Sequence, residues 1–128
     1  CIVRDGRVLA CAHNQVWRLT DPTAHAEVCA IREACAAERT IQLDGATIYS
    51  TTEPCPMCFS AIHWARIGRI VYAARIEDAR RFGFNELTVA NDAMRRAGGL
   101  SIEIVPEVLR EASLAIFEFW RLRGGSAY

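Results

Sequence analysis

The alternation of short apolar stretches with longer amphipathic ones constrains the fold of this chain most. Stretches typical of strands occur at residues 2–12, 46–52, 69–74 and 100–105. Helical periodicity begins at Thr23 and at Cys55 and recurs at 76–81 and 107–123, and residues 86–97 form a polar helix or loop. The order β-β-α-β-α-β-α-β-α predicts right-handed crossovers and a three-layer α/β/α fold with a central mixed sheet.

Local signals support several of these boundaries. Asp5-Gly6 lies between two apolar runs and predicts a hairpin, because this dipeptide tolerates positive φ angles. Asp21 and Thr23 are both suitable N-caps for the first long helix. Pro after Cys55 suits the first position of the second long helix, which we expect to end at Gly68. In the last helix, the residues expected to face inward are Leu109, Ala112, Ile116, Phe119 and Trp120.

Length and charge restrict the classes of protein. The 128 residues, 52% of them hydrophobic, are enough for one domain, residues 1–128, with a core of its own. The net charge is zero, which argues against nucleic acid and membrane surfaces as partners, and no apolar run could span a membrane. All fifteen basic residues are Arg, which excludes Schiff-base chemistry by a lysine. Because the chain opens on Cys1-Ile2-Val3, within a strand, we expect an N-terminal segment to be missing.

The six cysteines fall into different groups. Cys11, Cys29 and Cys35 lie among apolar residues and are interpreted as small core residues, while Cys1 receives no assignment. Only Cys55 and Cys58 have the two-residue gap that metal sites use. Since neither spacing nor a signal peptide indicates secretion, the sequence predicts reduced thiols and a cytoplasmic location.

One imidazole and two thiols are the candidate metal ligands. His25 precedes the first long helix and Cys55 opens the second, so both should lie along one edge of the sheet. Cys55 and Cys58 are three residues apart and share a helix face. Together with His25 they provide three ligands for Zn²⁺, and a site with three protein ligands leaves the fourth position to water, as catalytic zinc sites do.

Glu27 is the candidate proton carrier. It is two positions from His25 on a helix, so it points away from the ligand direction but stays close enough to move protons. Taken alone, Cys55 and Cys58 would equally fit a redox pair or half of a structural zinc site, and His25 would fit a helix cap or a core histidine. Their joint occurrence, each at the start of a helix, favours catalytic zinc.

These motifs resemble the cytidine and deoxycytidylate deaminase superfamily over essentially the whole chain. The resemblance implies a cytidine-deaminase-like fold, in which His25, Cys55 and Cys58 bind zinc, Glu27 shuttles protons and Asn14 contacts the base. Ala26 would line the base pocket. The N-terminal helix and Pro-Phe-Gly segment of the family do not precede the hairpin here.

Two purine-specific branches of this superfamily share Asp-Pro-Thr-Ala-His-Ala-Glu, found here at residues 21–27. Residues 55–66, 72–74 and 83–84 and the final Tyr128 resemble the bacterial guanine deaminases more than the tRNA adenosine deaminases. The Gly-Phe-Asp-Asp of that branch reads Gly-Phe-Asn-Glu at 83–86, so Glu86 would be the second catalytic carboxylate. A carboxylate fits guanine, whose N1–H and 2-amino group are adjacent donors, better than adenine.

The expected activity is therefore zinc-dependent hydrolysis of guanine to xanthine and ammonia by a homodimer. His63 and Trp64 are candidate walls for the planar base, and Tyr128 is a candidate lid over its own or a neighbour's site. The alternatives are deamination of another aminopurine, a triazine or cytosine, deamination of adenosine in tRNA, and a silent zinc or base-binding module. The basic pairs Arg80-Arg81 and Arg95-Arg96 have acids among them and are interpreted as solvated helix faces without a nucleic-acid partner.

Overall fold

A computed structural model describes residues 1–128 of the protein. None of its helices has both the length and the apolar composition needed to cross a lipid bilayer. The predicted bounds of the strand at 69–74 and of the helix at 76–81 are confirmed. In chain order the elements are β1 (Ile2–Arg4), β2 (Arg7–Ala10), α1 (Val16–Leu19), α2 (Ala26–Glu38), β3 (Thr47–Thr52), α3 (Pro56–Trp64), β4 (Arg69–Ala74), α4 (Ile76–Arg81), α5 (Asn91–Ala97), β5 (Glu103–Val105) and α6 (Arg110–Leu122).

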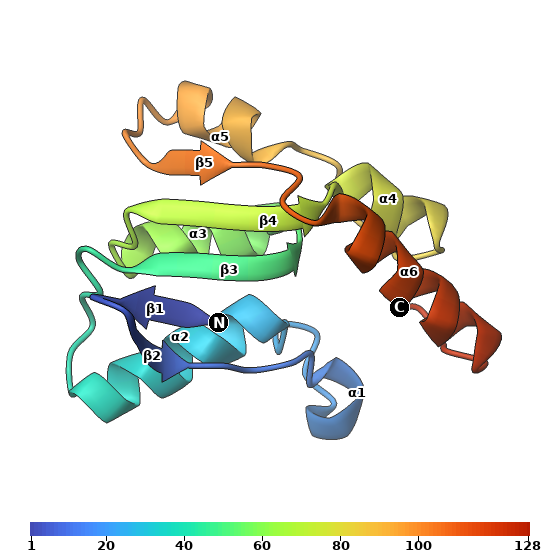
Figure 1. Ribbon diagram of the computed structural model, residues 1–128. Coiled ribbons are helices and arrows are strands. Elements are labelled where there is room, and N and C mark those ends of the chain that lie inside the picture. Colours follow the sequence, from blue (N-terminus) through green and yellow to red (C-terminus); the bar gives the residue numbers. More distant parts are fainter.

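The strands form one mixed sheet in the order β2-β1-β3-β4-β5 (Figure 1). β1 is antiparallel to β2 and to β3, whereas β3, β4 and β5 are parallel. The β1–β2 hairpin turns at Asp5 and Gly6, whose φ angles of 51° and 74° are the positive values that its tight turn requires. The predicted mixed α/β architecture is confirmed, and the carboxyl ends of β3 and β4 lie at the same edge of the sheet.

The main core lies between the sheet and two helices. Ile48 and Ile70 point from the central strands toward Phe59 and Ile62 of α3, and Ala34 brings α2 close to the same cluster. All five side chains are at most 2% exposed. This packing fixes α2 and α3 side by side on one face of the sheet, with their N-termini at the edge where β3 ends (Figure 1).

The opposite face carries α6, which contacts β4 and extends beyond the carboxyl ends of β3 and β4 in Figure 1. The prediction that its apolar stripe points inward is wrong for four of the five residues, since Ala112 is exposed together with the three large ones. Leu109 is 76% exposed, Ile116 57% and Phe119 58%. The buried residue of α6 is Ser113, whose hydroxyl donates to the carbonyl of Thr51 at 2.5 Å. Periodicity locates the stripe, but it does not say whether another element covers it.

Predicted helix boundaries shift at α2, at α3 and at α6, which begins at Arg110 and not at Glu107. α2 begins at Ala26 with His25 as its N-cap, whereas Asp21 accepts hydrogen bonds from the N–H and hydroxyl of Thr23 in the preceding turn. α3 ends at Trp64, before the expected Gly68, because Arg66 adopts a left-handed conformation with φ of 58°. The first shift places His25 in extended backbone, so that its side chain can turn toward α3.

The interpretation of Cys11 as a core residue is wrong. Cys11 is exposed and forms a disulfide with Cys1, ten residues earlier. The hairpin explains this pairing, since Ile2 lies opposite Ala10 and the flanking residues therefore meet. Cys29 is buried and Cys35 half-buried, and both are free thiols, as the sequence predicted.

Candidate active site

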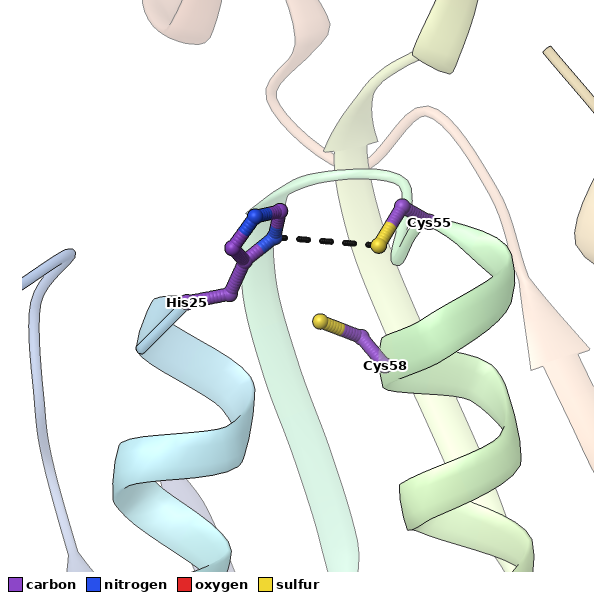
Figure 2. Close-up of side chains that lie close together, drawn as sticks. All are labelled: His25, Cys55 and Cys58. Carbon is purple, nitrogen blue, oxygen red and sulfur yellow. Dashed lines mark hydrogen bonds between the residues drawn. The ribbon is translucent and has the colours of Figure 1, made fainter. Parts of the chain in front are cut away.

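Two helix N-termini meet at the carboxyl edge of the sheet. His25 is the N-cap of α2, and Cys55 is the N-cap of α3 with Cys58 one turn further on. Pro56 occupies the first position of α3, where its missing N–H leaves no hydrogen bond unmade. Figure 2 shows the three side chains pointing toward a common centre. Their ligand atoms all lie within 4.8 Å of one another, and Cys55 Sγ is 3.7 Å from His25 Nδ1.

This donor set fits zinc. Imidazole nitrogen and thiolate sulfur are the ligands that zinc prefers, and three of them leave one tetrahedral position open. Cys58 is fully buried, whereas His25 and Cys55 are half-buried, so the centre opens on one side only. A ligand or water molecule can therefore approach the centre from the side of His25 and Cys55.

The ligand side chains prepare one another for metal binding. The hydrogen bond from the Cys58 thiol, and then that from His25, lower the pKa of Cys55 to about 4 despite its burial. Conversely, the hydrogen bond to Cys55 and burial raise the pKa of Cys58. The hydrogen bond to Cys55 also raises the pKa of His25. The low pKa of Cys55 favours the thiolate form that metal binding requires, and a bound cation would favour loss of the remaining protons.

Glu27 lies beside this cluster in the first turn of α2. Its Oε2 is 3.5 Å from Cys58 Sγ, and its Oε1 accepts a hydrogen bond of 2.7 Å from the Ser50 hydroxyl. Sequence reasoning missed Ser50, although its position on β3, two residues from the buried Ile48, places it on the same face. Ser50 fixes the orientation of the carboxylate and leaves Oε2 directed toward the metal-binding side chains.

A cavity of about 410 Å³ opens next to the cluster. It brings together most of the residues that the sequence singled out, and its walls also come from β3, α4, α6 and the C-terminal segment. The predicted site residues that line it are Asn14, His25, Ala26, Glu27, Cys55, Glu86 and Tyr128. Cys58 lies behind the cavity as the buried ligand.

The two candidate walls for the base, His63 and Trp64, are not among the residues that line this cavity. The Trp64 side chain is 80% exposed at the last position of α3, where its ring packs edge-on against His63. α3 begins at the site and runs away from it, so a residue at its far end lies beyond the cavity. The number of residues between Cys58 and Trp64 does not by itself show that α3 carries Trp64 away from the cavity.

Aromatic walls are the main feature that the sequence did not reveal. The cavity is lined by Trp17 of α1, Phe84 after α4, and Phe117 and Trp120 of α6. Phe84 stacks on Trp120 with ring centres 5.0 Å apart and meets Phe117 edge-on. These rings come from three separated segments, so no local pattern connects them, and together they make a flat apolar slot suited to a planar ring.

Tyr128 covers this slot. Its hydroxyl accepts a hydrogen bond from the Asn14 side chain, and its carbonyl accepts one of 2.9 Å from the N–H of Asn85. Its ring lies 5.9 Å from that of His25 and 5.7 Å from that of Phe84. Burial raises the pKa of the Tyr128 phenol, so the hydroxyl stays protonated near neutral pH.

Glu86 lies in the coil between α4 and α5 and lines the same cavity. Burial, and then the negative charge of Cys55, raise the pKa of its carboxyl group. The cavity is therefore lined by two carboxyl groups in different environments. Glu27 lies beside the cysteine side chains, and Glu86 lies on a half-buried coil segment.

Residues 1–74 match the family described as the cytidine and deoxycytidylate deaminase zinc-binding region, and this match includes all three metal-ligand candidates. The chain belongs to this deaminase family. It is 42% identical over 120 residues to guanine deaminase of Bacillus subtilis, which covers 94% of the chain and 76% of that protein. It is also 41% identical over 116 residues to the tRNA-specific adenosine deaminase of Agrobacterium fabrum, covering 86% and 75% respectively.

The fold comparison agrees with this membership. A solved guanine deaminase from Nitrosomonas europaea superimposes with a TM-score of 0.78 at 28% identity, over 87% of this chain. The chain spans 64% of that protein, which is less than two thirds of its length. As a deaminase of this family, the protein takes Zn²⁺ as its cofactor, for which His25, Cys55 and Cys58 are the ligand candidates. Identity alone leaves the guanine and adenosine branches close together, so the residues of the cavity must separate them.

Proposed function

We propose that the protein is a zinc-dependent hydrolase that converts guanine and water to xanthine and ammonia. The observation that carries this proposal is Glu86, an acidic side chain that shares one aromatic-walled cavity with Glu27 and the candidate zinc ligands. Similarity to guanine deaminases from two organisms supports the same assignment.

Hydrogen-bond complementarity is the reason that Glu86 favours guanine. The carboxylate can accept bonds from both N1–H and the 2-amino group of guanine, whereas adenine presents an unprotonated N1 at that edge. A buried site that is built for donors rejects a base without them by a factor of about 10⁴, because its polar groups would remain unpaired. Glu86 is half-buried and therefore partly shielded from water that would weaken this preference.

Glu27 carries the proton transfers in this proposal. When bound by His25, Cys55 and Cys58, zinc supplies a Lewis acid that makes water nucleophilic near neutral pH. Glu27 accepts a proton from the attacking water and returns it to the amino group that leaves as ammonia, so that no net charge accumulates on the protein. The hydrogen bond from Ser50 holds one carboxylate oxygen and leaves Oε2 for this transfer.

The other predicted residues position the base. The Asn14 side chain reaches the cavity from the loop before α1 and can hydrogen-bond the edge of a purine. Ala26 adds only a methyl group at the start of α2, which leaves room for a ring beside Glu27. Tyr128 closes the slot from above and limits the access of bulk water to the reacting carbon.

A substrate panel tests the proposal. Purified, zinc-loaded protein is incubated with guanine, adenine, cytosine and the triazine ammeline, and ammonia release is followed. We expect rapid release from guanine and at least about 10³-fold slower release from adenine. Turnover of another base with guanine unchanged would overturn the assignment, and release from none of the bases with zinc bound would favour a silent binding module.

Deamination of adenosine in tRNA is the second candidate, which similarity to the Agrobacterium protein favours. Binding to tRNA needs cationic side chains that are free to contact phosphates. Here Arg95 and Arg96 both pair with Asp92, and Arg121 pairs with Glu118. Of the same basic pairs, Arg80 contacts the Thr88 hydroxyl and Arg123 the Phe119 ring, so most of this charge is matched within the chain. We therefore propose no nucleic-acid partner, and a tRNA with adenosine in its anticodon loop belongs in the same panel as the discriminating substrate.

We also propose that the protein functions as a homodimer. Leu109, the N-cap of α6, and Phe119 within the helix are exposed. A second apolar cavity of about 440 Å³ lies between α6 and the side chains of Tyr49 and Val71 on the open sheet face. A second copy that covers this surface would remove it from water. Sedimentation should show a dimer that Leu109→Glu with Phe119→Glu dissociates, whereas Ile41→Glu, at an exposed position after α2, leaves it intact.

A cytoplasmic location stays a prediction. The free thiols of Cys29, Cys35, Cys55 and Cys58 fit a reducing compartment, whereas the Cys1–Cys11 disulfide needs an oxidant to form. Fractionation of cells that express the protein, together with thiol labelling of Cys11, tests both points at once.

A further inference from the structure

A buried carboxylate lies directly before the metal-binding loop, which comprises residues 54–58 and carries Cys55 and Cys58. Glu53 follows the last residue of β3 and is only 4% exposed. Its Oε2 accepts a hydrogen bond of 3.3 Å from the N–H of Ile76, and its Oε1 accepts one of 2.7 Å from the N–H of Asn91. These donors are the first residues of α4 and α5, so one side chain binds the starts of two helices.

Asn91 also contacts the metal-binding loop through its side chain. Its side-chain amide donates a hydrogen bond of 2.5 Å to the carbonyl of Pro54, the residue before Cys55. Its own Oδ1 is buried without a hydrogen-bond partner. The donated hydrogen bond therefore fixes the orientation of the Asn91 side chain toward Pro54.

The chain segment that carries Glu86 runs between the two helix starts that Glu53 binds. α4 begins at Ile76 and α5 at Asn91, and Phe84 and Glu86 lie in the chain between them. Both ends of this segment are therefore tied to Glu53. Since Glu53 is also two residues from Cys55, the same carboxylate links the metal-binding loop to the segment that carries Glu86.

We propose that Glu53 is a positioning residue that sets the location of Glu86 relative to the metal centre. A buried carboxylate has a large desolvation cost, and an apolar side chain at the end of β3 would fill the space without it. Glu53 instead accepts hydrogen bonds from the N–H groups of Ile76 and Asn91, so the carboxylate connects the starts of α4 and α5. The inference deepens the proposed function, because the role of Glu86 in base recognition rests on that proposal.

Hydrogen–deuterium exchange of the zinc-loaded Glu53→Gln variant tests the physical link without any substrate. The two N–H donors bind different oxygens of Glu53, and glutamine replaces one of these oxygens by an NH₂ group, so one donor loses its acceptor. We expect faster exchange in residues 54–58 and 82–90 together, with the β1–β2 hairpin unchanged. Glu103→Gln, an exposed carboxylate on β5 that pairs with Arg69, is the control that should change neither segment. Unchanged exchange, or a rise in only one segment, would overturn the link.

A double-mutant cycle then tests the route by which Glu53 affects catalysis. If Glu53 acts through Glu86, then Glu53→Gln raises KM for guanine at least about tenfold while kcat changes less. In a Glu86→Gln background, the same substitution should add little further increase in KM. A purely structural role predicts instead that the two effects multiply and that kcat falls with the amount of folded protein, and this result would overturn the positioning role.

Asn91→Ala keeps the backbone donor to Glu53 and removes only the contact to Pro54. It should therefore speed exchange in 54–58 and spare 82–90, which makes it the informative variant if Glu53→Gln does not fold. Equal loosening of both segments would assign the coupling to Asn91 and overturn the role of Glu53. If the exchange pattern holds while wild-type protein leaves guanine unchanged, the link stands and the proposed substrate fails.

Discussion

Arg110, the first residue of α6, forms a bidentate ion pair with Asp78 of α4. Its Nε lies 3.0 Å from Oδ2 and its Nη2 lies 2.7 Å from Oδ1. Asp78 is buried and also accepts the N–H of Arg75 at 2.9 Å. The pair therefore joins two helices that both border the cavity. Because α6 supplies Phe117 and Trp120 to the aromatic wall, this contact holds the wall in place.

Replacing Asp78 by Asn should destabilise the protein by about 2–4 kcal/mol. The neutral amide loses the charge that compensates Arg110 and cannot accept all of the donors that surround it. Urea denaturation measures the effect. The control is Glu118→Gln, which breaks an exposed pair with Arg121 within α6 and should alter stability little. If both substitutions lowered the free energy of unfolding equally, the buried Asp78–Arg110 pair would contribute no more to stability than an exposed pair.

The same pair predicts how stability depends on acidity. Burial alone acts to raise the pKa of Asp78, but hydrogen bonds from Arg110 and the backbone N–H of Arg75, with the nearby charges, bring it below its ordinary value. The unfolded chain therefore binds a proton at Asp78 before the folded protein does. The stabilisation is complete above about pH 4 and is lost as the pH falls through the lower folded pKa. In acid titrations, Asp78→Asn should remove this component of the loss, and an unchanged acid slope would contradict it.

Glu27→Gln should retain zinc and lose activity. The amide has similar size and can still accept from Ser50, but it cannot take up a proton, so we expect kcat to fall by a factor of about 10²–10⁴. Zinc content by metal analysis and kcat by ammonia release separate binding from catalysis. Glu33→Gln, an exposed residue further along α2, is the matched control. Substantial activity in Glu27→Gln would remove Glu27 from the role of proton carrier.

Glu86→Gln should weaken guanine recognition. The glutamine NH₂ group would face the donors of guanine, so we expect kcat/KM for guanine to fall by a factor of about 10² or more, with zinc retained. Steady-state kinetics with guanine and adenine show whether discrimination between the two bases falls in parallel. A small change in both would mean that another group reads this edge of the base.

Trp17→Ala should loosen the cover of the site. The Trp17 indole N–H donates to the carbonyl of Ser126 at 3.3 Å, and its ring packs edge-on against Tyr128. Loss of both contacts should raise KM about threefold to tenfold and speed exchange in residues 124–128. Leu19→Ala, an exposed residue at the end of α1, provides the control. An unchanged KM would show that Trp17 does not support the cover.

The metal ligands and the strands were predictable because their signals are local. The gap between Cys55 and Cys58, and the Asp5-Gly6 turn, are visible within a few residues, and the periodicity of residues 69–81 fixes a strand and a helix to the residue. The exposure of Phe119 depends instead on which element covers α6, and no pattern within the helix contains that information.

Long-range contacts account for what sequence reasoning missed. The disulfide of Cys11 arises from the register of a hairpin, and the aromatic wall combines Trp17, Phe84 and Trp120 from segments far apart in the chain. The position of Trp64 also depends on a long-range relationship, since the direction in which α3 leaves the site places that ring outside the cavity. Such relationships follow from packing, which local spacing does not encode.

The contact between Asn14 and Tyr128 joins two segments that are 114 residues apart in the chain. The Asn14 amide donates one of its two hydrogens to the Tyr128 hydroxyl, and its Oδ1 accepts a hydrogen bond of 3.1 Å from the N–H of Val16. The second amide hydrogen is left for another acceptor. If Asn14 holds the base as proposed, one side chain then supports both the substrate and its cover, so a substitution at Asn14 would disturb both together.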